Sequence, residues 1–200
     1  MEPDLLSLET YSEFADALRK SNCQKCSLCK SRTNIVVDRG NPQAKIMVIG
    51  EAPGENEDLQ GKAFVGRAGQ LFDSVMKSIG LDTNVDMLIC NVAKCRPPEN
   101  RAPRPEEAKA CFPFLTHQIK LVKPKIIILL GATALKYLDP TKKNFSMGEE
   151  TGKFFKLEQY PWISFMVFYH PAALLYNSKL KEPMFQHAKK LKEFLNNEKI

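Results

Sequence analysis

Three polar side chains of this sequence stand where apolar runs end. Glu51 follows one run, Asn91 lies near the end of another, and His170 follows a third. Because the carboxyl ends of parallel strands lie along one edge of an open α/β sheet, we expect these side chains to line one crevice. With an aromatic ring nearby, an acid, an amide and an imidazole can read and polarise a planar base. A lone histidine before a proline is more often structural. A functional role for His170 is therefore favoured only because the acid, the amide and the aromatic ring are expected beside it.

The cysteines form a second set of residues that could carry chemistry. Cys23, Cys26 and Cys29 make two overlapping CxxC pairs, and Cys95 and Cys111 bracket a proline-rich stretch. Such spacing favours metal binding or reduced thiols over a disulfide framework. CxxC alone favours zinc or redox chemistry. The fifteen residues between Cys95 and Cys111, without a second CxxC, disfavour a zinc ribbon.

The first apolar run and the helix after it enclose an unusual loop. Residues 46–49 read as a buried strand that stops at Gly50, and a helix is expected from near Gly66 to Gly80 because apolar residues there share one stripe. The loop between them holds several acids and Phe64, and exceeds the ~2 to 6 residues usual for such connections. An ordinary connection with solvated acids and a core Phe64 remains the alternative. The loop has neither GxGxxG nor GK[ST], so no nucleotide cofactor is indicated.

The rest of the chain alternates strands and helices. Strands are expected at residues 87–92, 125–131, 153–157 and 162–169, and helices near residues 11–18, from 105, at 132–138, from 171 and near 185–195. The run 125–131 is apolar on both faces, which predicts a central strand. Pro113 predicts a kink or a restart in its helix just after Cys111. This regular alternation predicts one α/β domain over residues 1–200.

Composition and charge limit the possible classes of function. No apolar run is long enough to span a bilayer, and the N-terminus lacks a basic region followed by an apolar segment. We therefore expect a soluble, cytoplasmic protein without membrane contact. The net charge is +6, and residues 1–22 hold five acids against two basic residues, so the remainder is more basic. This remainder suits a polyanionic partner, although a solvated lysine-rich surface is the more common explanation of such charge.

Several segments together resemble the iron-sulfur uracil-DNA glycosylases of family 4. They are GEAPGENED, GKAFVGRAGQLF, CNVAKCRPPENRAPRPEE, LLGATAL and HPAALL, and they extend from about Cys23 to Leu175. The resemblance implies an α/β fold, a three-layer α/β/α sandwich with a central four-stranded parallel sheet. It also implies a monomer that excises uracil from single- or double-stranded DNA and leaves an abasic site. Thr151 and Gly152 depart from the Arg-Gly often found in relatives, which leaves a DNA contact in doubt.

The resemblance also assigns residues. It implies a 4Fe-4S cluster on four cysteines and a uracil pocket of five residues, and it leaves Cys29 and Cys90 without a role. The expected cluster ligands are Cys23, Cys26, Cys95 and Cys111. The expected pocket residues are Glu51, Ala52, Phe64, Asn91 and His170. Ala52 stands where some members have glycine.

Elementary chemistry suggests what these side chains would do. Cleaving an N-glycosidic bond leaves positive charge on the sugar and negative charge on the base, and His170 would meet the uracil anion at O2. Asn91 can accept from N3–H and donate to O4, a pattern that cytosine inverts. Phe64 would stack on the flipped base. Glu51 could orient water or crowd the thymine methyl group, with Glu57 supporting it.

Two further questions stay open at the level of sequence. Leu174 and Leu175 follow His170 closely and could wedge into the DNA helix, or both could be core residues. A binding module that recognises damaged DNA without cutting it is a rival function. A covalent relative that traps the abasic sugar through a histidine in an insertion after GEAPG is a second rival, but that insertion is missing.

Overall fold

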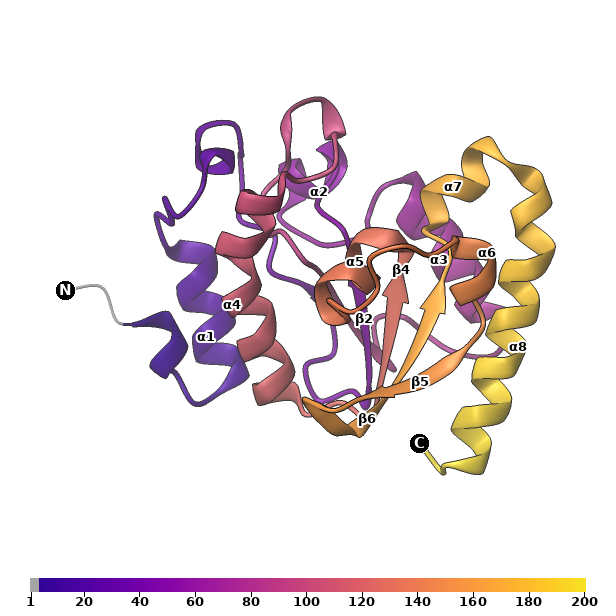
Figure 1. The fold of residues 1–200 in the computed structure, drawn as a ribbon. Coiled ribbons are helices and arrows are strands. Elements are labelled where there is room, and N and C mark those ends of the chain that lie inside the picture. Colours follow the sequence, from indigo (N-terminus) through magenta and orange to yellow (C-terminus); the bar gives the residue numbers. More distant parts are fainter. Residues whose placement is uncertain (1–3) are drawn as a thin grey trace.

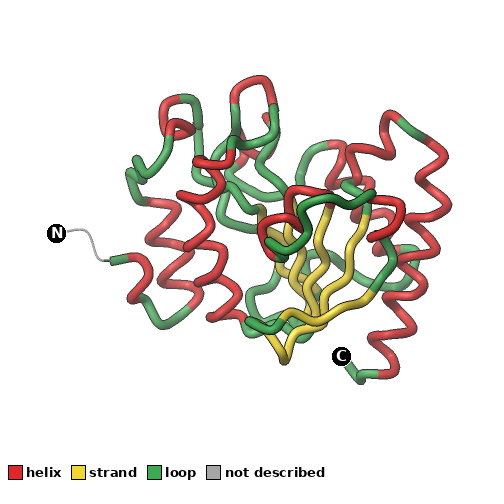
Figure 2. The backbone as a smooth tube through the Cα atoms, viewed as in Figure 1, coloured by secondary structure: helices red, strands yellow, loops and turns green. Residues whose placement is uncertain are grey.

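Three strands that are buried along their whole length form the middle of the sheet. They are β2 (Ile46–Gly50), β3 (Met87–Asn91) and β4 (Ile126–Leu130). This computed structural model describes residues 4–200 (Figure 1; Figure 2). β2 pairs in parallel with β3 on one side and β4 on the other, and β4 pairs in parallel with β6 (Tyr160–Phe168). The carboxyl ends of these four strands therefore lie along one edge.

The expected count of four strands is wrong: the four inner strands are parallel, as predicted, but two further strands lie at the edges of the sheet. The sheet has six strands in the order β1-β3-β2-β4-β6-β5, and both edge strands are antiparallel. β1 (Arg39–Gly40) has only two residues, too few to show any periodicity. β5 (Phe154–Leu157) reaches β6 through a tight turn, and strands joined so closely can pair only antiparallel.

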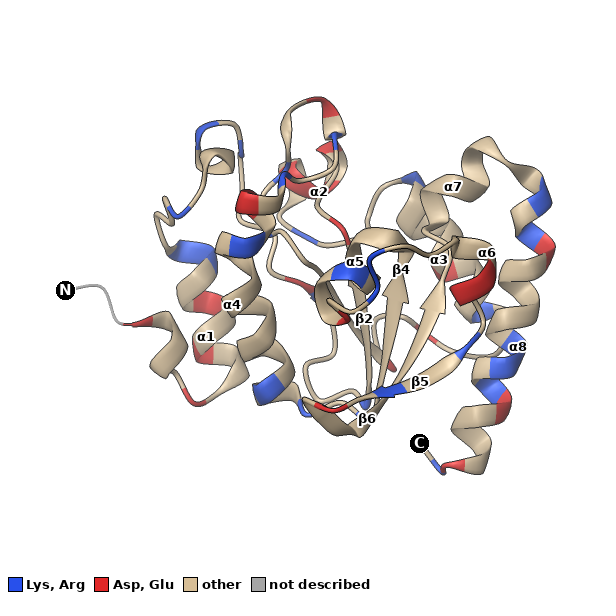
Figure 3. Ribbon diagram, in the orientation of Figure 1, with Lys and Arg blue, Asp and Glu red and all other residues tan. Residues whose placement is uncertain are grey.

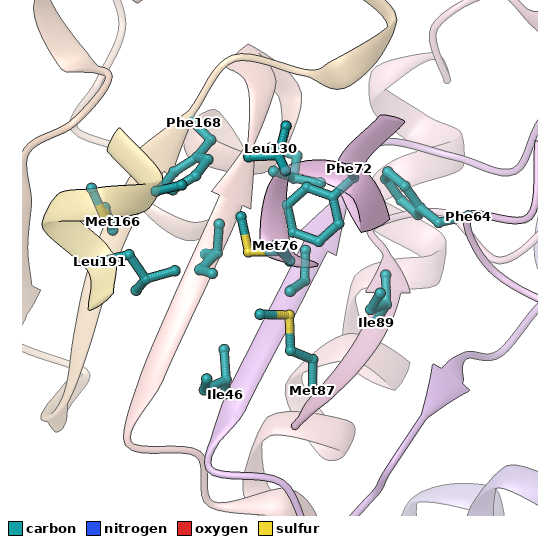
Figure 4. Packing of buried hydrophobic residues seen from close by; sticks show 14 of the residues in the cluster. Ile46, Phe64, Phe72, Met76, Met87, Ile89, Leu130, Met166, Phe168 and Leu191 are labelled. Carbon is teal, nitrogen blue, oxygen red and sulfur yellow. The ribbon is translucent and has the colours of Figure 1, made fainter. Parts of the chain in front are cut away.

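Helices cover both faces of the sheet, because successive strand residues point to opposite sides. One face packs against α3 (Arg67–Lys77), α7 (Pro171–Tyr176) and α8 (Lys181–Asn197), and Figure 4 shows Phe72, Met76 and Leu191 in this core. The other face packs against α4 (Pro105–Val122) and α5 (Gly131–Leu138). The sheet thus lies between two helical layers.

A third, smaller core lies at the N-terminal side, where α1 (Tyr11–Lys20) lies beside α4 (Figure 1). Phe14, Leu18 and Phe114 pack there with the cysteine-bearing segments. α4 runs through Pro113 as one element, so the helix does not restart after Cys111. The connections contain short helices: η1 (Leu5–Ser7), η2 (Ser27–Lys30), α2 (Glu55–Gln60), η3 (Pro98–Asn100), α6 (Met147–Glu150) and η4 (Ser178–Leu180).

Two surface features bear on partners. Lysine and arginine gather along α8 (Figure 3), where Lys189 and Lys190 are exposed. Within residues 4–200, no helix has both the length and the apolar character needed to cross a membrane.

Candidate active site

A cavity of about 630 Å³ opens beyond the carboxyl ends of the parallel strands. We call it the strand-end pocket. Its volume falls in the range of ~300 to 1,000 Å³ that is usual for small-molecule sites. Six residues expected from the sequence line it: Glu51, Ala52, Glu57, Phe64, Asn91 and His170. The topology therefore brings together side chains that are up to 119 residues apart in the chain, as Glu51 and His170 are.

Asn91 is the most unusual of these side chains. It is 1% exposed, yet neither its Oδ1 nor its Nδ2 has a hydrogen-bond partner among the described residues. An unsatisfied buried polar group costs ~1 to 3 kcal/mol. Gly50 makes the arrangement possible, because a Cβ there would lie 2.4 Å from Asn91 Oδ1 and 2.6 Å from the Phe64 ring. The amide is thus held beside the ring with its donor and acceptor unused.

Phe64 belongs to the hydrophobic core and also forms a wall of the pocket. Its backbone adopts φ 54°, a left-handed conformation that is rare for an aromatic residue. Gly69 allows this turn, because a Cβ at that position would lie 1.9 Å from the Phe64 carbonyl oxygen. The Phe64 ring centroid lies 5.8 Å from that of His170. Backbone strain of this kind persists only where the surroundings impose it, and it is often found at functional sites.

His170 caps the N-terminus of α7, and the cap assigns its tautomer. Its Nδ1 accepts a hydrogen bond from the backbone N–H of Ala172 at 3.2 Å. In the neutral ring the proton therefore sits on Nε2, which becomes the donor. Burial lowers the pKa of His170, and this effect outweighs the opposite influence of Glu51 and Glu57. At neutral pH the imidazole is accordingly uncharged and donates through Nε2.

The two glutamates differ in what they contact. Glu51 accepts a hydrogen bond from the hydroxyl of Thr133, which also lines the pocket. Glu57 accepts from the N–H of Gly66 at 2.7 Å and from the N–H of Gly54 at 3.1 Å. Both oxygens of Glu57 are therefore engaged by backbone amides, so this residue holds the ends of the long loop together.

The two leucines of α7 differ in how far they are exposed. Leu174 is 1% exposed and packs in the core, whereas Leu175 is 39% exposed. The burial of Leu174 favours the core alternative for that side chain. The next residue, Tyr176, is 90% exposed and lines the pocket. Leu175 and Tyr176 are thus the apolar groups that α7 presents to solvent.

Sequence reasoning assigned no role to several residues that line the strand-end pocket. The Thr151-Gly152 departure from the family pattern lies outside this pocket. Thr133, Arg67 and Tyr176 line the pocket, but no role was predicted for them. Thr133 and Arg67 lie within the LLGATAL and GKAFVGRAGQLF segments, and Tyr176 directly follows HPAALL, so these motifs were the signal that could have found them. Gly152 lies instead against His187, where a Cβ would lie 2.4 Å from the imidazole ring.

The cysteines form a second site at the N-terminal side, which we call the cysteine pocket. Cys23, Cys26, Cys95 and Cys111 line it, but Cys29 and Cys90 do not. All are free thiols.

Nitrogen donors also reach the cysteine pocket. Arg32 donates to the Cys23 carbonyl oxygen at 2.7 Å and to Cys95 Sγ at 3.7 Å. The backbone N–H of Lys94 donates to Cys111 Sγ at 3.2 Å. These donors suit sulfur that carries negative charge.

The donor set allows a test of which group would fit. Burial raises the pKa of Cys95 to about 12 and of Cys111 to about 11, so these thiols stay protonated until a metal displaces the protons. Among the described residues, no three His, Cys, Asp or Glu side chains converge closely enough for a single ion. One zinc ion would gather all four sulfurs into a single tetrahedron, whereas a cluster takes one thiolate per iron. The four cysteines of this pocket could each supply one thiolate to a group of several irons.

Comparison with known proteins agrees with this geometry. The family model described as the uracil DNA glycosylase superfamily matches residues 37–194. A type-4 uracil-DNA glycosylase of Saccharolobus solfataricus is 45% identical over 96% of this chain and 90% of its own length. Proteins with the same name from Thermotoga maritima and Archaeoglobus fulgidus are each 40% identical, over 90% and 86% of this chain and 93% and 87% of their own lengths. The chain therefore belongs to the uracil-DNA glycosylase superfamily and, within it, to the type-4 uracil-DNA glycosylases.

Proposed function

We propose that this protein removes uracil from DNA by hydrolysing its N-glycosidic bond, which leaves an abasic site. The observation that carries the proposal is the unpartnered amide of Asn91, buried beside Phe64 and in one cavity with His170. A uracil ring presents an N3–H donor and an O4 acceptor, which match an amide oxygen and an amide N–H. Bound uracil would therefore satisfy both orphan atoms. Cytosine has the opposite pattern on this edge, so the same amide discriminates against it.

The reaction needs charge stabilisation rather than a bound cofactor. As the bond lengthens, negative charge grows on the departing base and positive charge on the sugar. The His170 ring is neutral, so its Nε2–H can donate a hydrogen bond to uracil O2 while negative charge develops on the base. A fixed donor of this kind is often worth ~100-fold or more in rate.

Glu51 is the group that we assign to the attacking water. Its contact with the Thr133 hydroxyl fixes the carboxylate in the pocket wall, which leaves it able to accept a hydrogen bond from water. Phe64 stacks on the extruded base, and Ala52 lies beside this arrangement in the pocket wall. Glu57 acts indirectly, through the loop that it closes.

DNA itself is the proposed partner, in single- or double-stranded form. Arg67 is exposed at the strand-end pocket, where it can contact a phosphate next to the extruded base. Leu175 is our candidate for the wedge that holds the helix open. We also propose that the protein acts as a monomer built as one domain.

We assign a 4Fe-4S cluster to Cys23, Cys26, Cys95 and Cys111. The membership in type 4 and the spacing of the thiols support this choice over zinc. When bound, the group cross-links the N-terminal segment to the proline-rich loop and its helix. No step of base removal requires it.

The decisive experiment measures free uracil released from labelled oligonucleotides, single-stranded and paired with G or A, by the purified protein. We expect release without added cofactor, and we expect oligonucleotides carrying cytosine in place of uracil to stay intact. An Asn91→Ala variant is the matched control for contaminating activity. Tight binding of uracil-containing DNA without any release would identify a binding module and refute the proposal.

A further inference from the structure

Lys94 is a lysine in a place where lysines are rarely found. It is 1% exposed and among the largest fully buried side chains of the protein. In sequence it stands three residues after Asn91 and directly before Cys95. Its Nζ donates to the Asn91 carbonyl oxygen at 2.7 Å and to Oε1 of Gln118. The side chain therefore ends at the strand that carries the base-reading amide.

This buried cation has no carboxylate to balance it. None of the ion pairs within residues 4–200 includes Lys94, and its two acceptors are neutral. A buried charge without a counter-charge costs several kcal/mol. Its other surroundings are the cysteine pocket, which Lys94 lines. There its backbone N–H donates to Cys111 Sγ at 3.2 Å.

Asn91 needs support of the kind that Lys94 gives. Because the Asn91 amide makes no hydrogen bond of its own, only the backbone sets where it lies. β3 ends at Asn91, and the next two residues are held by hydrogen bonds from Val92 N–H to Gly50 and from Ala93 N–H to Glu51, at 2.9 and 3.0 Å. The remaining hydrogen bond at this point is the one from Lys94 Nζ to the Asn91 carbonyl oxygen.

We propose that Lys94 is a positioning residue that joins the two sites: its charge balances the thiolates of the cysteine pocket while its Nζ holds the backbone of Asn91. The assignment of base reading to Asn91 rests on the proposed function. The charge-balancing half stands on the cysteine pocket alone. A lysine that merely fills core volume would do neither.

The test compares iron-loaded Lys94→Met with the wild type. Methionine has a similar length and no charge, so it fills the space but cannot donate to the Asn91 carbonyl oxygen. We expect a more negative reduction potential, because a nearby cation favours uptake of an electron by the cluster. We also expect ~10- to 100-fold faster iron loss to a chelator, and kcat for uracil release lower by a similar factor with little change in KM, as for other residues that orient a site indirectly.

Lys25→Met is the matched control. Lys25 also lines the cysteine pocket, but it is exposed and contacts the ring of Phe114 rather than Asn91. Its charge is screened by solvent, so potential, iron retention and kcat should all stay near the wild type. Equal effects of the two substitutions would overturn the proposal, because they would show a general influence of nearby charge.

Gln118→Glu separates the two halves and serves if Lys94→Met does not fold. The new carboxylate neutralises Lys94 and still accepts its hydrogen bond. The substitution gives up the two donations of Gln118 Nε2, to Tyr11 and to the Val37 carbonyl oxygen, but it leaves the Asn91 contact in place. The potential should move as in Lys94→Met while kcat stays near the wild type. An unchanged potential in Gln118→Glu, or an unchanged kcat in folded Lys94→Met, would overturn the proposal. An iron-loaded wild type that releases no uracil would instead refute the proposed function, with the potential measurements still decisive for charge balance.

Discussion

The strand-end pocket and the cysteine pocket are built by opposite means. The strand-end pocket lies where four parallel strands end, and backbone hydrogen bonds and glycines fix its side chains. The cysteine pocket is formed by loops, the end of α1 and one turn of α4, and burial raises the pKa of the Cys95 and Cys111 thiols. One site is therefore ready before its ligand arrives, whereas the other is completed by the group it binds.

Besides Lys94, the side chain of Glu107 ties the two regions together. It is buried and accepts hydrogen bonds from Ser27 of the cysteine segment at 2.7 Å and from both terminal nitrogens of Arg101 at 2.8 Å. Arg101 in turn lines the strand-end pocket, and its hydrogen bonds lower the pKa of Glu107 to about 2. Damage to the cysteine pocket should therefore reach the other pocket, but not the reverse.

Removal of a cysteine is the largest perturbation that this comparison predicts. Cys95→Ser should abolish bound iron and most soluble folded protein, because it opens the cross-link that completes this side of the molecule. Iron and sulfide analysis, visible absorbance and circular dichroism measure the effect. Cys29→Ser is the control and should keep both iron and fold, since Cys29 lies outside the pocket. Loss of iron from Cys29→Ser and not from Cys111→Ser would show that the ligand set is wrong.

Changes within the strand-end pocket should affect the rate far more than stability. Asn91→Ala or His170→Ala should slow uracil release by ~100-fold or more, because each side chain acts on charge that develops in the transition state. Iron content should match the wild type in both variants, and so should the melting temperature of Asn91→Ala, whereas His170→Ala loses the cap of α7 and should melt slightly lower. Single-turnover kinetics, iron analysis and thermal melting measure these effects. Equal losses of DNA affinity and rate would argue against these roles.

Leu174 and Leu175 separate two roles of α7, which are packing in the core and contact with DNA. Leu174→Ala should cost ~2 to 5 kcal/mol of unfolding free energy and reduce activity on single and double strands together, as for other large buried side chains. Leu175→Ala should leave the melting temperature unchanged and slow excision only from duplex DNA, since an unpaired base needs no unstacking. Excision assays on both substrates, run beside thermal melts, distinguish the two. A matched loss on both substrates in Leu175→Ala would remove it as the wedge.

The smallest expected effect is in the pH profile. Burial holds the pKa of His170 below 6.5, so the neutral donor is present throughout the range above that value. The contribution of this group to stability is likewise complete above pH 6.5 and is lost as the pH falls through the lower folded pKa. We expect kcat to stay level as the pH falls to about 6.5 and to drop only below it. A rate that instead falls as the pH rises, through an alkaline limb absent from His170→Ala and present in His187→Gln, would show a charged imidazole in the active form.

Much of this molecule follows from local sequence. Four long apolar runs predicted the inner strands, because strands buried on both faces are continuously apolar. Glu51, Asn91 and His170 could be placed at one edge since parallel strands put their carboxyl ends there. The edge strands were less accessible: β1 is too short for any pattern, and pairing direction depends on neighbours.

The sequence by itself determined which residue types stand at the strand ends and how the cysteines are spaced. Only the tertiary structure decided their partners. In the tertiary structure Leu174 is buried and Leu175 is exposed. The sequence could not predict which, because in a helix of six residues either side chain could face the sheet. It engaged Glu57 with two backbone amides and left the Asn91 amide without a partner. It also buried Lys94 between the two pockets, a placement that no local pattern marks, because burial of a charge depends on groups that are brought together from distant parts of the chain.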